Sequence, residues 1–336
     1  MPEAHIGPEP QIGPAPLMGA ILAAGRGTRM APFGDHYPKP LLPVGNKPLI
    51  EYQIEAMRAL GITEIAVLIG HKGYLITKVL GDGARFGVRL HYVEQTQMFG
   101  IAHALGRLEG VLTRPFLLML GDIYFTGADL GAMAAEFAAT GCAAVLAAKL
   151  EPDPAAIRKN FAILMDDTGR VTRVIEKPRH TANRLKGVGL YLFDPVIFDA
   201  IRRTPRTAMR DEYELTDAIQ VMIDDGNHTR VATCVADDIN LTSPADLLHC
   251  NLMVARMQGA ASLCAPSAAL HPGVTLDRAV IGPGVRVRQA ITIRRSVLLE
   301  DAVLDTDQDI DGMVISREQS VDVRSAFPHW PEGIDR

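Results

Sequence analysis

The stretch from Gly19 to Ile50, GAILAAGRGTRMAPFGDHYPKPLLPVGNKPLI, constrains the fold more than any other part of the chain. It begins with a short apolar run, Ala20 to Ala24, whose length is typical of a buried strand. Glycines follow at once, and they allow positive φ angles and close approach of the backbone to a ligand. Successive N–H groups in such a turn form an anion-binding nest. The segment therefore predicts a strand that delivers its carboxyl end to a phosphate site.

Two cations flank this glycine turn. Arg29 and Lys39 stand ten residues apart in a segment that also contains Pro32, Pro38, Pro40 and Pro43. Because proline fixes its own φ angle, the two cations are held in place by a stiff backbone. A glycine turn with fixed cations beside it is suited to binding a polyphosphate group.

Two common glycine motifs do not fit the stretch. A P-loop requires G-x-x-x-x-G-K-[ST], which does not follow the strand here, and a dinucleotide fingerprint requires a third glycine where Met30 stands. The compound pattern G-x-G-T-R-M-x-P, then P-K-P-L-L-P-V and K-P-L-I, instead resembles the signature of nucleotide-sugar pyrophosphorylases, the sugar-1-phosphate nucleotidyltransferases. In pattern it is most similar to long-form glucose-1-phosphate thymidylyltransferases and uridylyltransferases.

This resemblance implies roles for individual residues of the segment. It implies that Arg29 and Lys39 are catalytic cations and that Mg²⁺ is the cofactor. The nucleotide-binding positions that it implies in this segment are Leu22, Ala23, Gly25, Gly27 and Thr28.

Composition limits the class of protein. With 336 residues, 48% of them apolar and 22% charged, the chain has the composition of an ordinary soluble globular protein. A net charge of −5 provides no basic surface for nucleic acid, and no apolar run approaches the length of a membrane span. The four cysteines, Cys142, Cys234, Cys250 and Cys264, lack metal or redox spacings, so we expect reduced cysteines in a cytoplasmic protein. Residues 1–16 lack the features of a signal peptide and predict a flexible leader.

Apolar periodicity after residue 50 alternates between helix and strand. Helices are predicted over residues 51–61, 74–80 and 131–139 and from residue 212. Thr216 and Asp217, in the first turns of the last of these helices, are interpreted as structural. Strands are predicted over 65–69, 88–93, 116–120, 143–150, 160–164, 171–175 and 187–193. Such alternation predicts a mostly parallel sheet with helices on both faces. With the resemblance, it implies a Rossmann-like α/β nucleotidyltransferase domain with a mixed, mostly parallel sheet over residues 17–258.

A polar loop follows the strand predicted at 88–93. Gln95 carries an amide that can pair with both the donor and the acceptor of a pyrimidine edge, and Gly100 stands where a helix could begin. The segment resembles the base-reading loop Q-x-x-x-x-G-x-A-x-A of uridylyltransferases and thymidylyltransferases, which implies that Gln95 and the Gly100 backbone read uracil or thymine. Ile101 replaces a threonine found in some uridylyltransferases, and His103 is interpreted as structural.

Asp122 follows the apolar run 116–120 directly, in the sequence L-G-D. At the carboxyl end of a central strand it could bind Mg²⁺, which takes one or two carboxylates together with phosphate oxygens. It could also cap the turn that follows. The L-G-D match implies the catalytic and metal-binding role.

A sugar-binding segment is implied at Glu176-Lys177-Pro178, which matches the E-K-P motif of the family. The pair could hold sugar hydroxyls and the sugar phosphate, or be a solvated charge pair at a strand end. The strand over 187–193 resembles the sugar-pocket strand, and Val188 and Tyr191 are its implied contacts. Phe161-Ala162 replaces the usual Y-G, so we expect the alanine methyl group to crowd the sugar side.

The segment from Asp237 to Leu247 is similar to the second metal segment of the family, D-x-x-T-P-x-D-L, with two extra residues before Ser243-Pro244. Either Asp238 or Asn240 could therefore supply the second metal ligand. Ser243-Pro244 predicts a helix start with proline at the first helical position, which makes Asp246 a helix residue.

The last part of the chain has a different pattern of apolar residues. Apolar residues recur every six positions between 281 and 303, the period of a left-handed parallel β-helix. About five repeats predict fewer than two coils over residues 265–316, so we expect this short helix to pack on the catalytic domain, on another subunit in a homo-oligomer, or on both. Residues 317–336 form a tail to which the sequence assigns no role.

The resemblance implies transfer of a nucleotidyl group from a nucleoside triphosphate, UTP or dTTP, to a sugar-1-phosphate, with release of pyrophosphate. A non-catalytic nucleotide-binding regulatory or assembly subunit of the same fold is the alternative. Loss of a cation or metal ligand would mark that alternative, but Arg29, Lys39 and Asp122 are all present.

Overall fold

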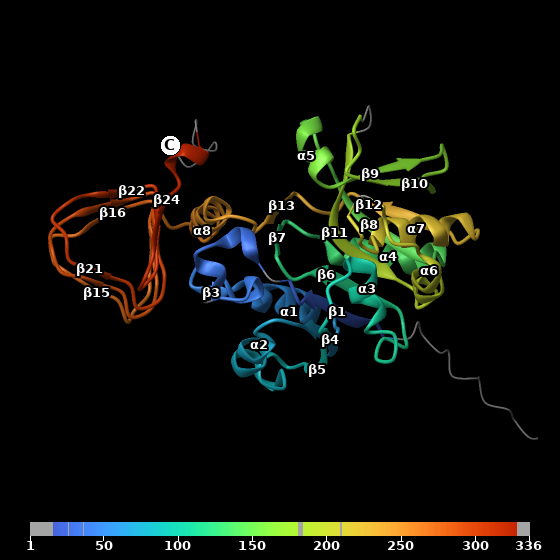
Figure 1. Ribbon diagram of the computed structural model, residues 1–336, viewed down its shortest axis with the longest axis horizontal. Coiled ribbons are helices and arrows are strands. Elements are labelled where there is room, and N and C mark those ends of the chain that lie inside the picture. The colour runs from blue at the N-terminus through green and yellow to red at the C-terminus, as the bar shows by residue number, and fades with distance from the viewer. Residues whose placement is uncertain (1–15, 26, 36, 181–183, 209, 328–336) are drawn as a thin grey trace, which may run out of the picture.

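The computed structural model describes residues 16–327 except 26, 36, 181–183 and 209. It consists of a large α/β unit and a smaller coil of short strands, with a long helix between them (Figure 1). The predicted leader lies almost entirely outside the described residues. No helix within them is long and apolar enough to cross a membrane.

A nine-stranded mixed sheet forms the centre of the α/β unit. Its main path runs β10-β9-β11-β6-β1-β4-β5, and β8 pairs with β11 and β12. The pairs β1–β4, β1–β6, β4–β5 and β8–β12 are parallel, whereas β11 is antiparallel to its neighbours. The strands are β1 (Met18–Ala23), β4 (Glu64–Ile69), β5 (Arg89–Glu94), β6 (Phe116–Leu120), β8 (Ala144–Leu150), β9 (Phe161–Met165), β10 (Val171–Glu176), β11 (Leu185–Phe193) and β12 (Thr229–Ala232).

Helices cover both faces of this sheet. One apolar core joins the sheet to α3 (Ile101–Gly106), α6 (Ile197–Arg203) and α7 (Leu215–Asp224), and a second joins it to α1 (Leu49–Ala59), α2 (Gly73–Leu80) and α4 (Leu130–Thr140). Neighbouring residues of β1 serve opposite faces, because side chains alternate along a strand: Ala20 belongs to the first core and Ile21 to the second. The predicted Rossmann-like mixed sheet is confirmed.

Three smaller elements complete the α/β unit. The strands β7 (Ile123–Thr126) and β13 (Asp237–Asn240) form an antiparallel pair, β2 (Pro43–Val44) and β3 (Lys47–Pro48) form a hairpin, and α5 (Pro154–Lys159) precedes β9. The long helix α8 (Pro244–Met257) starts as predicted, with a capping box between Ser243 and Asp246. Asp246 is thus engaged in capping this helix.

The C-terminal coil is a parallel β-helix with three sides. Its first side holds β14 (Leu263–Cys264), β17 (Val280–Ile281), β20 (Val297–Leu298) and β23 (Met313–Ile315); its second holds β15 (Ala269–Leu270), β18 (Arg286–Val287) and β21 (Val303–Leu304); its third holds β16 (Thr275–Asp277), β19 (Thr292–Arg294) and β22 (Ile310–Asp311). These strands make three stacked coils, so the expectation of fewer than two coils is wrong. Leu263, Val280, Val297 and Val314 stack in register, which gives 17 residues per coil.

The first side of the coil packs against α8. Val280, Val297 and Val314 share an apolar core with Leu247, Cys250 and other residues of α8. The coil therefore packs on the α/β unit of its own chain, one of the expected arrangements (Figure 1). Self-association stays a prediction. The first part of the C-terminal tail adds β24 (Ser320–Asp322), which pairs antiparallel with β23 and closes the coil.

Asn251 of α8 links this helix to the β2–β3 hairpin. Its Nδ2 donates to the carbonyl oxygens of Pro43 and Leu247, both at 2.9 Å, and its Oδ1 accepts from the N–H of Gly45 at 2.8 Å. The side chain is 1% exposed. Every polar atom of this buried amide is therefore paired. The amide fixes the β2–β3 hairpin, which follows Lys39 in the chain.

We expect Asn251→Ala to lower the free energy of unfolding by about 1–3 kcal/mol, because the partners of the amide lose their hydrogen bonds. Urea denaturation followed by circular dichroism measures this change. Arg256→Ala, at an exposed position of the same helix, is the control with little expected effect. Equal stability of the two variants would contradict the role of Asn251.

Candidate active site

The glycine turn begins where β1 ends, at the carboxyl edge of the parallel strands. The N–H of Gly121 donates to the carbonyl oxygen of Leu22 at 2.9 Å, and a Cβ at Gly121 would lie 2.7 Å from that oxygen. This contact brings the ends of β1 and β6 close together. Gly25 faces open space, because a Cβ there would have no protein atom within 4 Å.

Gly27 packs against the Lys39 side chain. It has φ +67°, and a Cβ at this position would lie 3.1 Å from the Lys39 Cγ. A larger residue would therefore be strained and would push on the lysine. The next three residues form the 3₁₀ helix η1 (Thr28–Met30), on which Thr28 and Arg29 are exposed.

Lys39 and Asp122 form an ion pair at the mouth of the sheet. Lys39 lies in the 3₁₀ helix η3 (Lys39–Leu41) and is 7% exposed, and its Nζ lies 2.9 Å from Asp122 Oδ2. A charge this deeply buried needs a partner, and the carboxylate after β6 provides it. Two residues predicted to be catalytic, 83 positions apart, thus meet directly.

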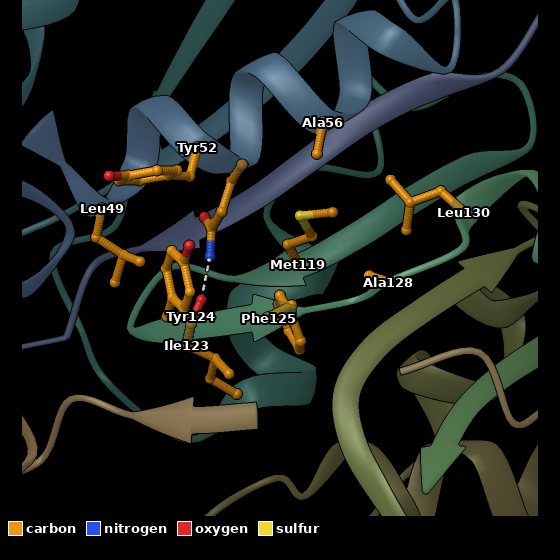
Figure 2. A pocket seen from close by; sticks show the side chains of 10 residues that line it. Leu49, Tyr52, Ala56, Met119, Ile123, Tyr124, Phe125, Ala128 and Leu130 are labelled. Carbon is orange, nitrogen blue, oxygen red and sulfur yellow. Dashed lines mark hydrogen bonds between the residues drawn. The ribbon is translucent and has the colours of Figure 1, made fainter. Parts of the chain in front are cut away.

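Gln53 of α1 holds the turn that carries Asp122 through two hydrogen bonds. The Gln53 Nε2 donates to the carbonyl oxygens of Leu120 and Ile123, at 2.8 and 3.0 Å, on either side of Gly121 and Asp122. Gln53 also lines a small cavity of about 170 Å³. The other residues that line this cavity are mostly apolar and come largely from α1 and β7 (Figure 2). The Gln53 side chain is 3% exposed, so the turn is fixed by a contact made inside the protein.

Asn240 and Asp238 lie in the same strand, β13, but have different surroundings. In the β13–β7 pair, Asn240 lies opposite Ile123, and the N–H of Leu241 donates to the carbonyl oxygen of Asp122 at 2.8 Å. The backbone next to Asn240 thus adjoins Asp122. Asp238 lies further along, opposite Phe125, and its fully buried carboxylate accepts two hydrogen bonds from Lys186 Nζ at 2.7 and 3.0 Å.

A second lysine joins this buried charge cluster. Lys149 Nζ contacts Asp237, lies 3.3 Å from Glu151 and lies 3.5 Å from Asp238. These carboxylates raise the pKa of Lys149 above its ordinary value, against the effect of burial. The cluster ties β8, β11 and β13 together with two cations and three carboxylates.

A cavity of about 270 Å³ joins the glycine turn, the ion pair and the predicted base-reading loop. The predicted site residues that line it are Leu22, Ala23, Gly25, Lys39, Gln95, Gly100 and Asp122. Gly27, Thr28 and Arg29 do not line it. The structure therefore brings residues from four separate segments to one cavity, as the positions of the strands predict.

Gly100 is fixed by the backbone of Tyr213. It has φ +105°, and a Cβ there would lie 2.4 Å from the Tyr213 carbonyl oxygen. The N–H of Ala102 donates to that oxygen at 3.0 Å, and the N–H of Tyr213 donates to the carbonyl oxygen of Phe99 at 2.6 Å. Only glycine fits this position without displacing the loop that precedes α7.

The predicted sugar residues do not line this cavity. Glu176 borders a separate hollow of about 410 Å³, where its Oε1 lies 3.3 Å from Arg210 Nη1 and 3.5 Å from Lys177 Nζ. Burial, together with Glu214, raises the pKa of Glu176, while the two cations oppose this shift. Lys177 has φ +41° and is exposed to solvent at the end of β10.

Val188 and Tyr191 are buried in β11, with 1% and 3% exposure. The Tyr191 ring stacks between Phe161 and Phe193, with centroid distances of 6.1 and 5.4 Å, and burial raises its pKa. Phe161 also packs on Gly187, where a Cβ would lie 1.9 Å from its ring. Side chains at 188 and 191 thus pack inside the protein.

The profile of the family described as nucleotidyl transferase matches residues 18–237, which hold most of the cavity lining. The chain belongs to this nucleotidyl transferase family. The family resemblance predicted from the glycine and proline pattern is thereby confirmed.

Relatives of this nucleotidyl transferase include proteins named as a nucleotidyltransferase and as glucose-1-phosphate thymidylyltransferases. It is 35% identical over 241 residues to the low-salt glycan biosynthesis nucleotidyltransferase Agl11 of Haloferax volcanii, an alignment covering 71% of this chain and 66% of the relative. It is 31% identical over 318 residues to a glucose-1-phosphate thymidylyltransferase of Streptomyces griseus, covering 90% and 87%. The structure of UDP-glucose pyrophosphorylase with UDP-glucose matches in fold, with TM-score 0.64, 23% identity, and 72% and 100% coverage.

Sequence reasoning missed three residues of this nucleotidyl transferase, Arg210, Glu212 and Gln53. Arg210 brings a cation to Glu176, and the nearby Glu212 lines the cavity of about 270 Å³, so the loop before α7 borders both hollows. The only feature of the sequence that points to this loop is Arg210, which stands beside the run D-E-Y-E. The sequence around Gln53 contains no such feature, because the role of Gln53 depends on a contact across 67 residues of sequence.

We expect Lys186→Met to lower the free energy of unfolding by about 3 kcal/mol, because it removes the main partner of the buried Asp238 carboxylate. The double variant Lys186→Met/Asp238→Leu should recover at least half of this loss, since it removes both charges. Urea denaturation measures both values. Lys159→Met, at an exposed position, is the control.

A double variant no more stable than Lys186→Met would show that the pair is not the source of the loss. Asp238 would then be open to another role.

Proposed function

We propose that the protein transfers a nucleotidyl group from a pyrimidine nucleoside triphosphate to a sugar-1-phosphate and releases pyrophosphate. The cavity of about 270 Å³ supports this function, because it joins a glycine turn, a lysine–carboxylate pair and a glutamine amide. These groups match a triphosphate at one end and a base edge at the other. The name of the Streptomyces griseus relative agrees with this reaction.

Asp122 and Asn240 would hold Mg²⁺ as its two protein ligands. A carboxylate and an amide oxygen are the hard donors that Mg²⁺ takes together with phosphate oxygens, and the backbone around them is hydrogen-bonded. We choose Asn240 over Asp238 because the Asp238 carboxylate is committed to Lys186. When bound, Mg²⁺ would neutralise charge on the α-phosphate.

In the proposed reaction, an oxygen of the sugar phosphate attacks the α-phosphorus in line, the bond to the bridging oxygen breaks, and pyrophosphate leaves. Positioning and charge stabilisation dominate such transfers. Lys39 would neutralise charge at the α-phosphate, and Arg29, exposed on η1, would bind the leaving pyrophosphate. The N–H groups of Gly25, Gly27 and Thr28 would hold the triphosphate.

The sugar end would use the hollow beside β10. Glu176 would accept hydrogen bonds from sugar hydroxyls. Lys177 and Arg210 would bind the sugar phosphate, since both cations lie beside the Glu176 carboxylate. Tyr191 would support this site from inside the protein, because its buried side chain belongs to the same core as Val174, which lines the hollow. Val188 belongs to the core on the opposite face of the sheet, so we propose no contact between its side chain and the sugar. The loop before α7 borders both hollows and would connect the two substrates.

The experiment that tests this function measures pyrophosphate release with Mg²⁺ across UTP, dTTP, CTP, ATP and GTP and several sugar-1-phosphates. We expect release with UTP or dTTP far above that with the purine nucleotides, and none when Mg²⁺ is chelated. A purine preference would refute base reading by Gln95. Tight nucleotide binding without release would favour the non-catalytic regulatory alternative.

We expect Arg29→Ala to lower kcat by about 10²–10³, because a placed charge that stabilises the leaving group is typically worth that factor. Arg29 is exposed, so the melting temperature should stay unchanged. Arg89→Ala, at an exposed position on β5, is the matched control. Turnover of Arg29→Ala close to that of wild type would remove Arg29 from the mechanism.

A further inference from the structure

We propose that His103 fixes the orientation of the Gln95 amide and thereby makes the enzyme reject cytosine. The proposal rests on the proposed function, in which Gln95 reads a pyrimidine. It deepens that function by assigning base specificity to a residue that was interpreted as structural from the sequence.

The contact between the two side chains carries the proposal. Gln95 is 6% exposed and lines the nucleotide cavity, and its Nε2 lies 2.9 Å from His103 Nδ1. An amide nitrogen has only donors. Nδ1 must therefore be the acceptor, which places the imidazole proton on Nε2 of the ring and leaves the ring neutral.

The ring of His103 is itself held by aromatic neighbours. Phe99 meets it edge to face at a centroid distance of 5.3 Å, and Tyr213 stacks on it at 6.2 Å. The backbones of Phe99 and Tyr213 also fix Gly100. One local structure therefore positions both groups proposed to read the base.

The surroundings of His103 favour its neutral form. Burial lowers its pKa, and the nearby guanidinium groups of Arg107 and Arg206 lower it further. The Arg206 guanidinium lies over the Phe99 ring, 4.7 Å from its centroid. The acceptor at Nδ1 is thus available to Gln95 at neutral pH.

Fixing the amide decides which base edge it accepts. With one N–H of Gln95 given to His103, its Oε1 and its other N–H remain for the base. Uracil and thymine present an N3–H donor next to a carbonyl acceptor, whereas cytosine presents an N3 acceptor next to an amino donor. An amide that cannot rotate by 180° opposes like groups when cytosine binds, and such mismatches at a hydrogen-bonding site give strong rejection.

The test compares kcat/KM for UTP, dTTP and CTP in wild type, His103→Leu and His103→Asn. Asparagine offers an Oδ1 acceptor near the position of Nδ1, whereas leucine offers none. We expect His103→Leu to lower the discrimination against CTP at least about tenfold, and His103→Asn to keep it within about threefold of wild type.

The Gln95→Met variant and its double variant with His103→Leu separate this role from a structural one. Because His103 is proposed to act only through the amide, His103→Leu should not change the discrimination further once the amide is gone. His103→Phe, which keeps a ring between Phe99 and Tyr213, replaces His103→Leu if the latter does not fold.

Unchanged discrimination in His103→Leu or His103→Phe, or equal losses in the asparagine and leucine variants, would overturn the proposal. A wild-type protein that turns over no pyrimidine nucleotide would instead overturn the proposed function. The two failures are therefore distinguishable.

Discussion

The ion pair between Lys39 and Asp122 is the contact on which the candidate site depends. It joins the proline-rich segment after β1 to the turn after β6, and its lysine is almost fully buried. A buried ammonium group is unstable without a partner, so the fold that buries Lys39 also requires a carboxylate at this place. Gln53 then fixes the carbonyl oxygens on either side of that carboxylate.

Two polar residues of β13 have different surroundings. Asp238 neutralises Lys186 inside the protein, while Asn240 lies two residues further along, and the residue after it bonds to the Asp122 backbone. Strand geometry places both residues in reach of the same region. Burial and pairing therefore commit the Asp238 carboxylate to Lys186, and this commitment is the basis for proposing Asn240 as the ligand.

The sequence predicted those parts of the fold that depend on local pattern. The strand over 116–120 has the predicted bounds, the start of α8 at Ser243-Pro244 follows from capping chemistry, and the glycine turn lies where the signature places it. These features depend on residues a few positions apart. The structure also brings together Lys39 and Asp122, two residues that the motifs predicted for the site.

Features that depend on distant contacts were missed or wrong. The prediction gave too few coils because the first strands, around Leu263 and Leu270, have too few apolar positions to continue the six-residue pattern. One side of each coil is also a residue shorter than that period. Tyr191 could not be recognised as buried, since Phe161 and Phe193 reach it from two strands. The commitment of Asp238 to Lys186 spans 52 residues and leaves no local signal.

The most direct test of the account follows the phosphorus atoms themselves. UTP and dTTP labelled separately at the α- and γ-phosphates are incubated with the sugar-1-phosphates of the pyrophosphate-release assay, Mg²⁺ and the protein. The account predicts that the α label enters a sugar-containing product and that the γ label leaves in pyrophosphate. Transfer of the γ label to the sugar, or retention of both labels in the triphosphate, would contradict it.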